Sequence, residues 1–368
     1  MTFRGFGFTT GMWLSGLCWG QVLQSEGFES FTTGELQGQA GWLALPGGSL
    51  FDVMPGMVEV TTLMAKSGAK SVRLRSDLLV NGESLFAFKP LGTPVGNSSS
   101  LVICDFWMAS QGSSGSLFGG ASYSSTGDFL ASVTAEAEQG SVMASWLSTP
   151  VGTIVPQNWN RVTVVHNMAA NQVVAYMNGQ GLGSVSGNFL PANFSDMDFY
   201  ADGGGASQSF FDDISIEKTG LGVIRGHLEL GDYIAPPQGV PTEVSINDAA
   251  TGSPILVLPL LLRADGMISV STGLRGTFDV RFKPWHWVSK TFNNVEISDL
   301  GAHFLDYSAT NGDADGSDEV DAADIDAVIS AFGLTGPPNN IREDIDGSGE
   351  VDAVDIDIVI GNFGAAGD

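Results

Sequence analysis

The last part of the chain contains one short unit twice, and this duplication constrains the fold more than any other feature. Asp313–Asp324 reads DADGSDEVDAAD, and Asp344–Asp355, which begins 31 positions later, reads DIDGSGEVDAVD. Each segment is followed by a run of the form I-D-x-V-I-x-x-F-G. Such a repeat predicts two acidic loops that each lead into a short apolar helix, rather than a disordered acidic tail.

The spacing of oxygen-bearing residues within each segment matches a calcium loop. Ca²⁺ takes about six to eight oxygen ligands, and a twelve-residue loop supplies them from positions 1, 3, 5, 7, 9 and 12. Position 7 contributes its backbone carbonyl, and position 9 acts through a water molecule. We therefore expect two Ca²⁺ ions, held by Asp313, Asp315, Ser317, Glu319, Asp321 and Asp324 in the first loop and by Asp344, Asp346, Ser348, Glu350, Asp352 and Asp355 in the second.

The two loops differ at position 6, where the chain must turn sharply. Gly349 supplies this turn in the second loop without steric cost, whereas the first loop has Asp318. The first loop therefore needs a positive or bridging φ at a residue that tolerates it less well than glycine. Position 8 is valine in both loops, and Val320 and Val351 are candidates to pair the loops with each other.

From Asn311 to Gly364 the chain resembles the type I dockerin, a calcium-binding module that docks onto cohesin domains in extracellular bacterial assemblies. As in that family, the last ligand of each loop is aspartate and no helix precedes the loop. The family contacts cohesin through positions 10 and 11, which here are Ala322 and Ala323 in the first loop and Ala353 and Val354 in the second, where family members carry hydroxyl pairs. The resemblance implies a cohesin-like partner, with docking inside the same chain or onto an unknown surface receptor as alternatives.

The overall charge excludes some classes of partner. The 368-residue chain has a formal net charge of −26, and from Asp306 onward sixteen acidic residues accompany a single arginine, Arg342. A chain this acidic argues against nucleic acid and anionic membranes as partners. Abundant glycine with many Val, Thr, Ser and Phe residues favours β-sandwiches over helical bundles.

Residues 1–25 have the pattern of a secretory signal peptide. Arg4 precedes an apolar run that ends near Gly20, and a polar stretch follows. We expect cleavage between Gly20 and Ser25, and hence a protein that is secreted to the cell surface or beyond, with no membrane span in the mature chain. An N-terminal β-strand is the alternative interpretation. The mature chain would keep only Cys104 and have no internal disulfide.

Residues 26–218 alternate strand-like stretches of period two with Gly/Ser/Asn turns, as in a half-buried antiparallel sheet. The run RVTVVHNMAANQVVAYMNGQ from Arg161 predicts a hairpin. This region resembles the concanavalin A-like, laminin-G-like jelly rolls, with Phe28–Trp42, Asn158–Val165 and Asp198–Glu217 carrying the likeness. The resemblance implies a fold that hosts many functions, among them polysaccharide binding.

We considered catalysis in this region and predict no catalytic residue. A retaining glycosidase places two carboxylates about 5 Å apart, which on one strand requires alternate acidic residues. Glu136 and Glu138 have that spacing but lack aromatic and β-branched neighbours, and Asp212 with Asp213 is expected to close the sandwich through hydrogen bonds. Four tryptophans are candidates for a sugar platform but are expected in the core, namely Trp42, Trp107, Trp146 and Trp159.

Residues 223–305 predict a second small β-unit with six strands, at Val223–Leu230, Thr242–Asn247, Ile255–Leu262, Met267–Ser271, Gly276–Lys283 and Lys290–Ile297. It resembles the prealbumin-like or fibronectin-like sandwiches that precede dockerins, which implies a spacer role. Trp285 and Trp287 form either a ligand platform or a plug at the sandwich end. We therefore expect a mainly β chain: a jelly-roll β-sandwich over 26–218, a small β-sandwich over 223–305, and a small α-helical calcium-binding, dockerin-like module over 306–368.

These observations favour a secreted, calcium-dependent interaction protein whose jelly roll binds glycan or another surface and whose tail docks to a partner. The alternative is a dockerin-tethered enzyme that degrades polysaccharide, either a hydrolase acting on O-glycosyl bonds or a lyase. A surface protein without sugar affinity is a third interpretation.

Overall fold

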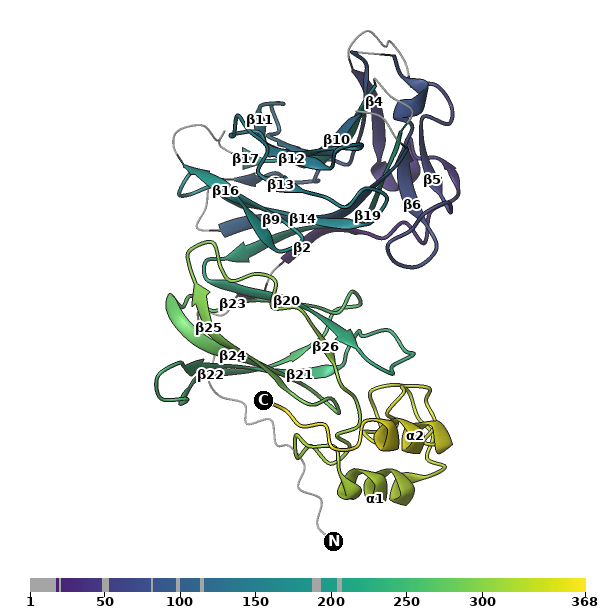
Figure 1. The fold of residues 1–368 in the computed structure, drawn as a ribbon, viewed down its shortest axis with the longest axis vertical. Helices are drawn as coiled ribbons and strands as arrows, with labels where there is room; N and C mark the ends of the chain where they lie inside the picture. The colour runs from purple at the N-terminus through teal and green to yellow at the C-terminus, as the bar shows by residue number, and fades with distance from the viewer. Residues whose placement is uncertain are drawn as a thin grey trace. The chain divides into compact units, whose positions relative to one another are not determined.

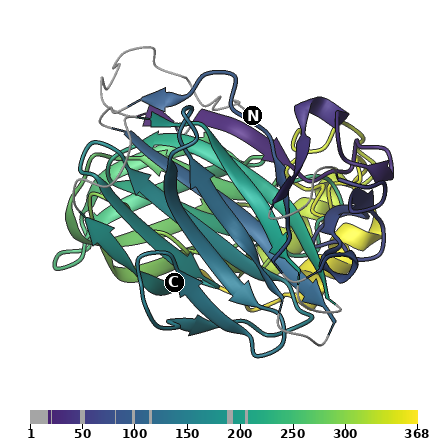
Figure 2. The same cartoon turned by 90° about the horizontal axis from the view of Figure 1, so that it is seen from above.

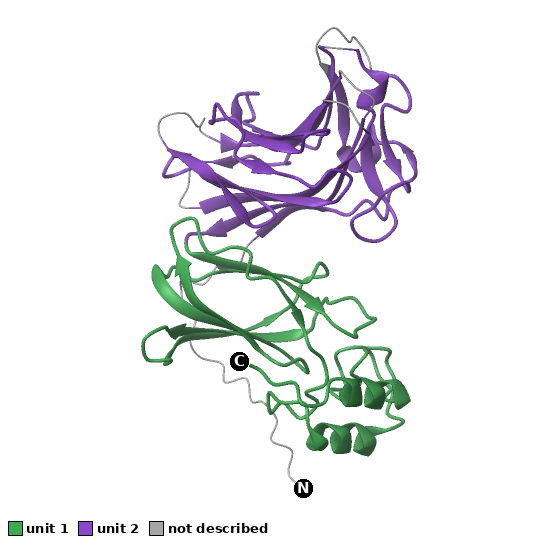
Figure 3. Cartoon of the chain, viewed as in Figure 1, with its two compact units in different colours: residues 1–19, 222–368 green, residues 20–221 purple. Residues whose placement is uncertain are grey.

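The computed structural model is mainly β and forms two compact units, which we describe separately (Figure 3). Unit 1 contains Gly222–Asp368 and the short strand Cys18–Trp19, and unit 2 lies within Gly20–Leu221. The structure describes residues 18–19, 21–47, 53–80, 82–96, 100–112, 116–186, 193–203 and 207–368. Among these residues, α-helix is confined to the C-terminal module, and no helix is both long enough and apolar enough to cross a membrane.

Unit 2 is a β-sandwich of two large sheets, which appear as two layers in Figure 1 and whose blue and teal strands are seen from above in Figure 2. The nine-stranded sheet contains β16 (Gln180–Ser186), β15 (Gln172–Met177), β14 (Asn160–Asn167), β9 (Ser100–Gln111), β19 (Gln208–Gly220), β6 (Ser71–Leu74), β5 (Val58–Thr61) and β3 (Gly34–Glu35) in that order, with β2 (Gln21–Glu26) paired to β19. The seven-stranded sheet runs β13 (Gly152–Thr153), β12 (Ser141–Ala144), β11 (Phe129–Glu136), β10 (Leu117–Tyr123), β18 (Asp196–Asp202), β7 (Ser84–Phe88), β4 (Leu43–Gly47). Strands β8 (Val95–Gly96) and β17 (Asn193–Phe194) form a separate short pair.

The core of unit 2 forms between these sheets because alternate residues of each strand point inward. Trp42, Phe106 and Phe199 are almost fully buried there, and the rings of Phe106 and Phe199 meet edge to face with centroids 5.0 Å apart. The predicted hairpin is confirmed, since β14 pairs antiparallel with β15 from Val162 opposite Met177 onward. The fold prediction for this region is confirmed as a β-sandwich.

The N-terminal segment is described only in part. Of the predicted signal peptide, residues 1–17 and 20 lie outside the described residues. Residues 21–26 form β2, in which Ser25 lies opposite Ser215 of β19. Cleavage at Gly20 would preserve this strand, whereas cleavage after Ser25 would remove most of it.

Unit 1 contains the second, smaller sandwich. One sheet has the order β1 (Cys18–Trp19), β23 (Met267–Ser271), β20 (Val223–Leu230) and β26 (Tyr307–Ala309), and the other has β22 (Pro254–Leu261), β21 (Pro241–Asp248), β24 (Gly276–Pro284) and β25 (Lys290–Ile297). Each of the six strands predicted from the sequence overlaps one of these. Val244, Phe282 and Trp287 are fully buried in the shared core.

The C-terminal module of unit 1 holds two short helices, α1 (Ala322–Ala331) and α2 (Ala353–Gly361), which lie beside each other (Figure 1). Each helix buries one valine of its apolar run, Val328 or Val359, in a small common core. The repeat explains this symmetry, because Val328 and Val359 occupy the same position of the repeated unit. Val288 of the small sandwich also belongs to this core, so the module packs onto that sandwich.

Candidate metal centre and ligand pocket

The same capping arrangement starts both helices and positions the acidic loop before each. Asp321 is the N-cap of α1, and its backbone N–H donates to the carboxylate of Asp324 at 2.8 Å. Asp352 and Asp355 repeat this capping box at 2.7 Å. The second oxygen of Asp324 accepts the N–H of Asp315 at 2.9 Å. The last residue of each loop is thus fixed by the first helical turn and also contacts its own loop.

In the second loop three buried carboxylates converge. Asp344, Asp346 and Asp355 each offer an oxygen atom, and these atoms lie within 4.8 Å of one another. Burial raises the pKa of Asp344 to about 6, and repulsion by the other two carboxylates adds to the shift. One buried oxygen of Asp344 has no hydrogen-bond partner among the described residues. A hard divalent cation stabilises such a cluster, so these residues fit Ca²⁺.

The first loop brings together Asp313, Asp315 and Asp324, also within 4.8 Å. Here a protein cation already contacts the cluster. The Lys283 ammonium, which reaches in from β24, forms an ion pair with the fully buried Asp313 and lies 3.7 Å from a carboxylate oxygen of Asp318. No ion pair of the described residues reaches the corresponding second-loop carboxylates. The two loops are therefore electrostatically unequal despite their repeated sequence.

Asp318 adopts the left-handed conformation that the sequence predicts for position 6, with φ of 73°, and Gly349 has φ of 92°. The carboxylate of Asp318 accepts bonds from the Ser289 N–H at 2.7 Å and hydroxyl at 2.6 Å, and from Arg281 at 2.8 Å. Burial alone would raise the pKa of Asp318, but these hydrogen bonds outweigh it and hold the pKa below its usual value. Asp318, which stands where the second loop has glycine, thus attaches the first loop to the small sandwich.

The other predicted ligands lie beside the carboxylate clusters. The hydroxyl of Ser317 donates to the carbonyl of Glu319 at 3.3 Å, so the oxygens of positions 5 and 7 are adjacent. Ser348 and Glu350 repeat this contact at 3.1 Å. The carboxylates of Asp321 and Asp352 cap the helices and are not among the clustered oxygens. A role for these six residues in holding an ion stays a prediction.

Val320 and Val351 are both buried in the module core. Their backbones do not pair with each other, however. The N–H of Val320 donates to the Ala365 carbonyl at 2.7 Å, and that of Val351 donates to the Leu334 carbonyl at 2.9 Å. Each loop therefore pairs with the segment that follows the opposite helix. The two valines nevertheless lie in one apolar cluster, which agrees with the expectation that position 8 brings the loops together, while the backbone of each loop pairs with the chain after the opposite helix.

The four residues predicted to contact a partner, Ala322, Ala323, Ala353 and Val354, are all exposed on the first turns of the helices. The structure adds a second exposed set that the sequence analysis did not single out. Ile329 and Phe332 of the first repeat, and Ile360 and Phe363 of the second, are each more than half exposed. Their identical offset of 31 residues was a usable signal, but exposure could not be deduced from it.

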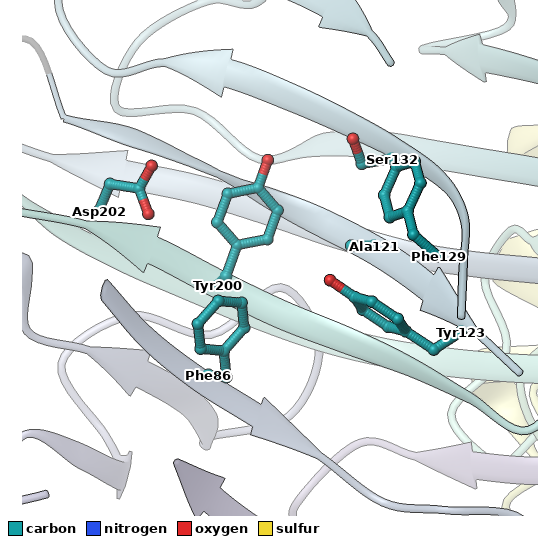
Figure 4. Close-up of a pocket in the computed structure, with 7 residues that line it drawn as sticks. All are labelled: Phe86, Ala121, Tyr123, Phe129, Ser132, Tyr200 and Asp202. Atoms are coloured by element: carbon teal, nitrogen blue, oxygen red, sulfur yellow. The ribbon is translucent and has the colours of Figure 1, made fainter. Parts of the chain in front are cut away.

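A pocket of about 260 Å³ lies on the seven-stranded sheet of unit 2 (Figure 4). Strand β18 supplies Tyr200 and Asp202 to this surface, because its even-numbered residues alternate with the buried residues Met197, Phe199 and Ala201. The pocket is lined by Phe86, Ala121, Tyr123, Phe129, Ser132, Tyr200 and Asp202.

The sequence contains the signal for this surface, although we did not predict it. Asp196, Asp198, Tyr200 and Asp202 form a D-x-D-x-Y-x-D pattern on one strand face. The acidic pair that we did consider behaves differently. Glu136 ends β11 and Glu138 lies in the following turn, so the two do not share a strand face.

Burial sets the electrostatics of the β18 face. It raises the pKa of Asp198 to about 8, and the charge of Asp196 raises it further in the same direction. One buried oxygen of Asp198 has no hydrogen-bond partner among the described residues. Burial also raises the pKa of Tyr200 to about 12, and its hydroxyl is hydrogen-bonded to Thr134. This face therefore offers hydroxyl and carboxyl groups beside exposed rings.

Several other candidates serve the fold. Of the four tryptophans expected in the core, Trp42 is fully buried there and Trp146 is half-buried against it. The expectation is wrong for Trp107, whose ring lies under the Lys66 ammonium, and for Trp159, whose indole donates to the Ala65 carbonyl, since both are half-buried outside that core. The Trp287 indole donates to the Gly231 carbonyl at 3.1 Å inside the small sandwich. The carboxylate of Asp212 accepts the N–H of Lys66 at 2.8 Å and that of Ser67 at 3.3 Å. These bonds tie two segments far apart in sequence, which agrees with a closing role for Asp212.

No family model matches this chain, and no curated protein does. Solved structures that match part of this chain include a sialidase, at 9% identity and a TM-score of 0.39, over 54% of this chain and 18% of that one. Domain 4 of AbnA, an extracellular arabinanase from Geobacillus stearothermophilus in complex with arabinotriose, matches at 15% identity and a TM-score of 0.34, over 55% of this chain and 94% of that one. A chain of a type II cohesin–X-dockerin complex from Acetivibrio cellulolyticus matches at 15% identity and a TM-score of 0.32, over 39% and 96%. At these levels the matches carry nothing about what this chain binds.

Proposed function

We propose that this is a secreted, calcium-dependent interaction protein. Its dockerin-like module, residues 306–368, holds two Ca²⁺ ions and docks to a cohesin-type partner or another surface receptor. Its jelly roll, residues 26–218, binds glycan or another surface, and the small sandwich, residues 223–305, is a spacer between them.

One observation carries the calcium assignment: two groups of three carboxylates, with oxygen atoms within 4.8 Å of one another in each group, occupy the same three positions of loops that begin 31 residues apart. Asp344 and Asp313 each occupy position 1 of a loop, and a bound ion would compensate the mutual repulsion of their clusters. The module is therefore expected to gain stability on binding Ca²⁺, because the ion binds the folded loops and not the unfolded chain.

Calorimetric titration of the full chain with CaCl₂ tests the assignment. We expect two ions per chain for the unaltered protein and none for the double variant Asp313→Ala with Asp344→Ala. The matched control replaces Asp326 and Asp357, which are exposed on the helices at the same 31-residue offset, and should still bind two ions. Two ions bound to the Asp313/Asp344 double variant would refute the loop assignment.

Docking is tested with purified type I and type II cohesin modules. We expect binding in CaCl₂, loss of binding in chelator, and weakening by Val354→Asp, which places a charge on an exposed apolar position of the second loop. Binding that chelator and Val354→Asp leave unchanged would contradict docking through this face. Failure of every cohesin to bind, with calcium stoichiometry intact, would favour the unknown surface receptor.

A second candidate function is a tethered polysaccharide-degrading enzyme. The observation that favours it is Asp198, whose pKa is raised to about 8 beside a second carboxylate, since a general acid needs a proton at neutral pH. Reducing-sugar assays of the full chain on a polysaccharide panel distinguish the two functions. Sugar release that Asp198→Asn abolishes would establish the enzyme.

A further inference from the structure

The hollow on the seven-stranded sheet has a simple physical origin. On the outer face, Tyr200 of β18 lies opposite Gly119 of β10, and Asp198 lies opposite Ala121. The next strand along, β11, carries Ser132 opposite Ala121. Large side chains on β18 thus face the small residues Gly119 and Ala121 in the middle of β10, so a trough remains between β18 and β11. No packing within the described part of unit 2 fills it.

Aromatic rings border this trough and remain accessible. The rings of Tyr123 and Phe129 meet edge to face with centroids 5.9 Å apart, and those of Phe86 and Tyr200 are tilted at 6.0 Å. Phe129 is 46% exposed, which is a large apolar area to leave on a sheet face. Figure 4 shows the rings arranged around the small side chain of Ala121. Each ring offers an apolar face or edge against which a ligand can pack.

The polar groups of the pocket restrict the ligand further. They are two tyrosine hydroxyls, the hydroxyl of Ser132 and the carboxylate of Asp202, and the lining contains no lysine, arginine or histidine. Asp198, beside it on β18, has a buried oxygen without a partner among the described residues. These groups accept hydrogen bonds from hydroxyls, whereas an anionic ligand would find no basic partner in the pocket and would meet the Asp202 carboxylate.

We propose that this pocket binds a neutral sugar unit of a polysaccharide, with its ring packed against Phe129 and Tyr123 and its hydroxyls donating to the acidic groups of β18. The inference rests on the proposed function, since it assigns the glycan site of the jelly roll and names the ligand class. Pockets that enclose drug-sized ligands measure about 300–1,000 Å³. A pocket of about 260 Å³ is smaller, so it takes one or two sugar rings rather than a long segment.

Calorimetric titration of the full chain tests the proposal, with neutral gluco-, xylo-, manno-, arabino- and galacto-oligosaccharides as probes and oligogalacturonate as the anionic comparison. We expect binding of at least one neutral probe and none of oligogalacturonate. Phe129→Ala should weaken binding at least tenfold, and Tyr200→Phe, which removes only a hydroxyl, about fivefold. The matched control is Leu117→Ala, because Leu117 is 40% exposed on β10 but does not line the pocket.

Each outcome decides the proposal. Failure of all neutral probes, equal binding of oligogalacturonate, or unchanged affinity in both Phe129→Ala and Tyr200→Phe would overturn it. The titrations are repeated in chelator, where sugar binding should persist because the pocket contains none of the calcium-loop residues. Sugar binding without calcium uptake would refute the calcium function and leave the pocket assignment standing. Two bound calcium ions with no sugar binding would refute the pocket assignment alone.

Discussion

Replacing Asp318 by glycine sets two opposing effects against each other. The repeat suggests that glycine belongs at this position, because the second loop has Gly349 there and because the φ of Asp318 is 73°. Left-handed backbone costs an ordinary L-residue about 1–2 kcal/mol, and aspartate somewhat less. Judged from the loop alone, Asp318→Gly should therefore be neutral or stabilising.

The tertiary contacts predict the opposite sign. The carboxylate of Asp318 accepts three hydrogen bonds, from both groups of Ser289 and from Arg281, at 2.6–2.8 Å. Hydrogen bonds to a charged group contribute about 1.5–3 kcal/mol each, but bonds that share one carboxylate do not add fully. Glycine also makes the unfolded chain more flexible, and the extra conformational entropy lost on folding lowers the stability by about 0.5–1 kcal/mol. We expect a net loss of about 2 kcal/mol, the lost bonds outweighing the relieved backbone strain.

Thermal unfolding of the full chain measures this effect. A loss of 1 kcal/mol in stability lowers the melting temperature by about 2–4 °C for a unit of roughly 150–250 residues, so the melting temperature of unit 1 should fall by about 4–8 °C. Hydrogen exchange at residues 286–292 and 313–324 assigns the loss to this contact. Asn294→Gly is the control, because Asn294 is exposed on β25 with φ of 56° and reports strain relief alone. An Asp318→Gly variant as stable as the parent, with Asn294→Gly unchanged, would refute the reasoning.

Three further predictions concern other parts of the structure. Lys283→Met leaves the buried Asp313 unpaired, so it should destabilise the calcium-free chain by about 3 kcal/mol and tighten calcium binding at the first loop. Calorimetry measures both effects. The control Lys290→Met, which removes the partner of the exposed Asp368, should show neither. Because the pKa of Asp198 is raised to about 8, its contribution to the free energy of unfolding of unit 2 is complete below about pH 4 and is lost as the pH rises through 8. Unit 2 should therefore resist urea better at pH 5 than at pH 8. Asp198→Asn should reduce that difference. Gly347→Ala should lower the free energy of unfolding by about 2–3 kcal/mol, because the added Cβ would lie 2.3 Å from the Tyr233 ring and the residue has φ of 70°. The control Gly252→Ala has φ of 69° but lies in open space, so it measures the backbone strain alone. Equal losses of stability for the two variants in thermal unfolding would contradict the clash.

Many strands could be located from the sequence because a half-buried sheet imposes a period of two. The predicted strands Val223–Leu230, Met267–Ser271 and Lys290–Ile297 coincide with the observed ones. The pocket was missed for a related reason. The alternation along β18 was visible, but the small residues Gly119 and Ala121 that make the face hollow come from a strand some eighty positions away. Only the pairing of β10 with β18 brings the two together.

The duplicated loops are local features, so the sequence by itself determined the capped helices, the left-handed turn at position 6 and the acidic residues that gather in each loop. Spacing alone brings those residues together, because a twelve-residue loop closes on itself. What the loops contact was decided by the tertiary structure. Lys283 and Ser289 reach the first loop from the small sandwich, and although the repeat differs at Asp318, nothing in that difference says which residues Asp318 contacts. Contacts across such separations depend on how whole sheets pack, which no local pattern encodes.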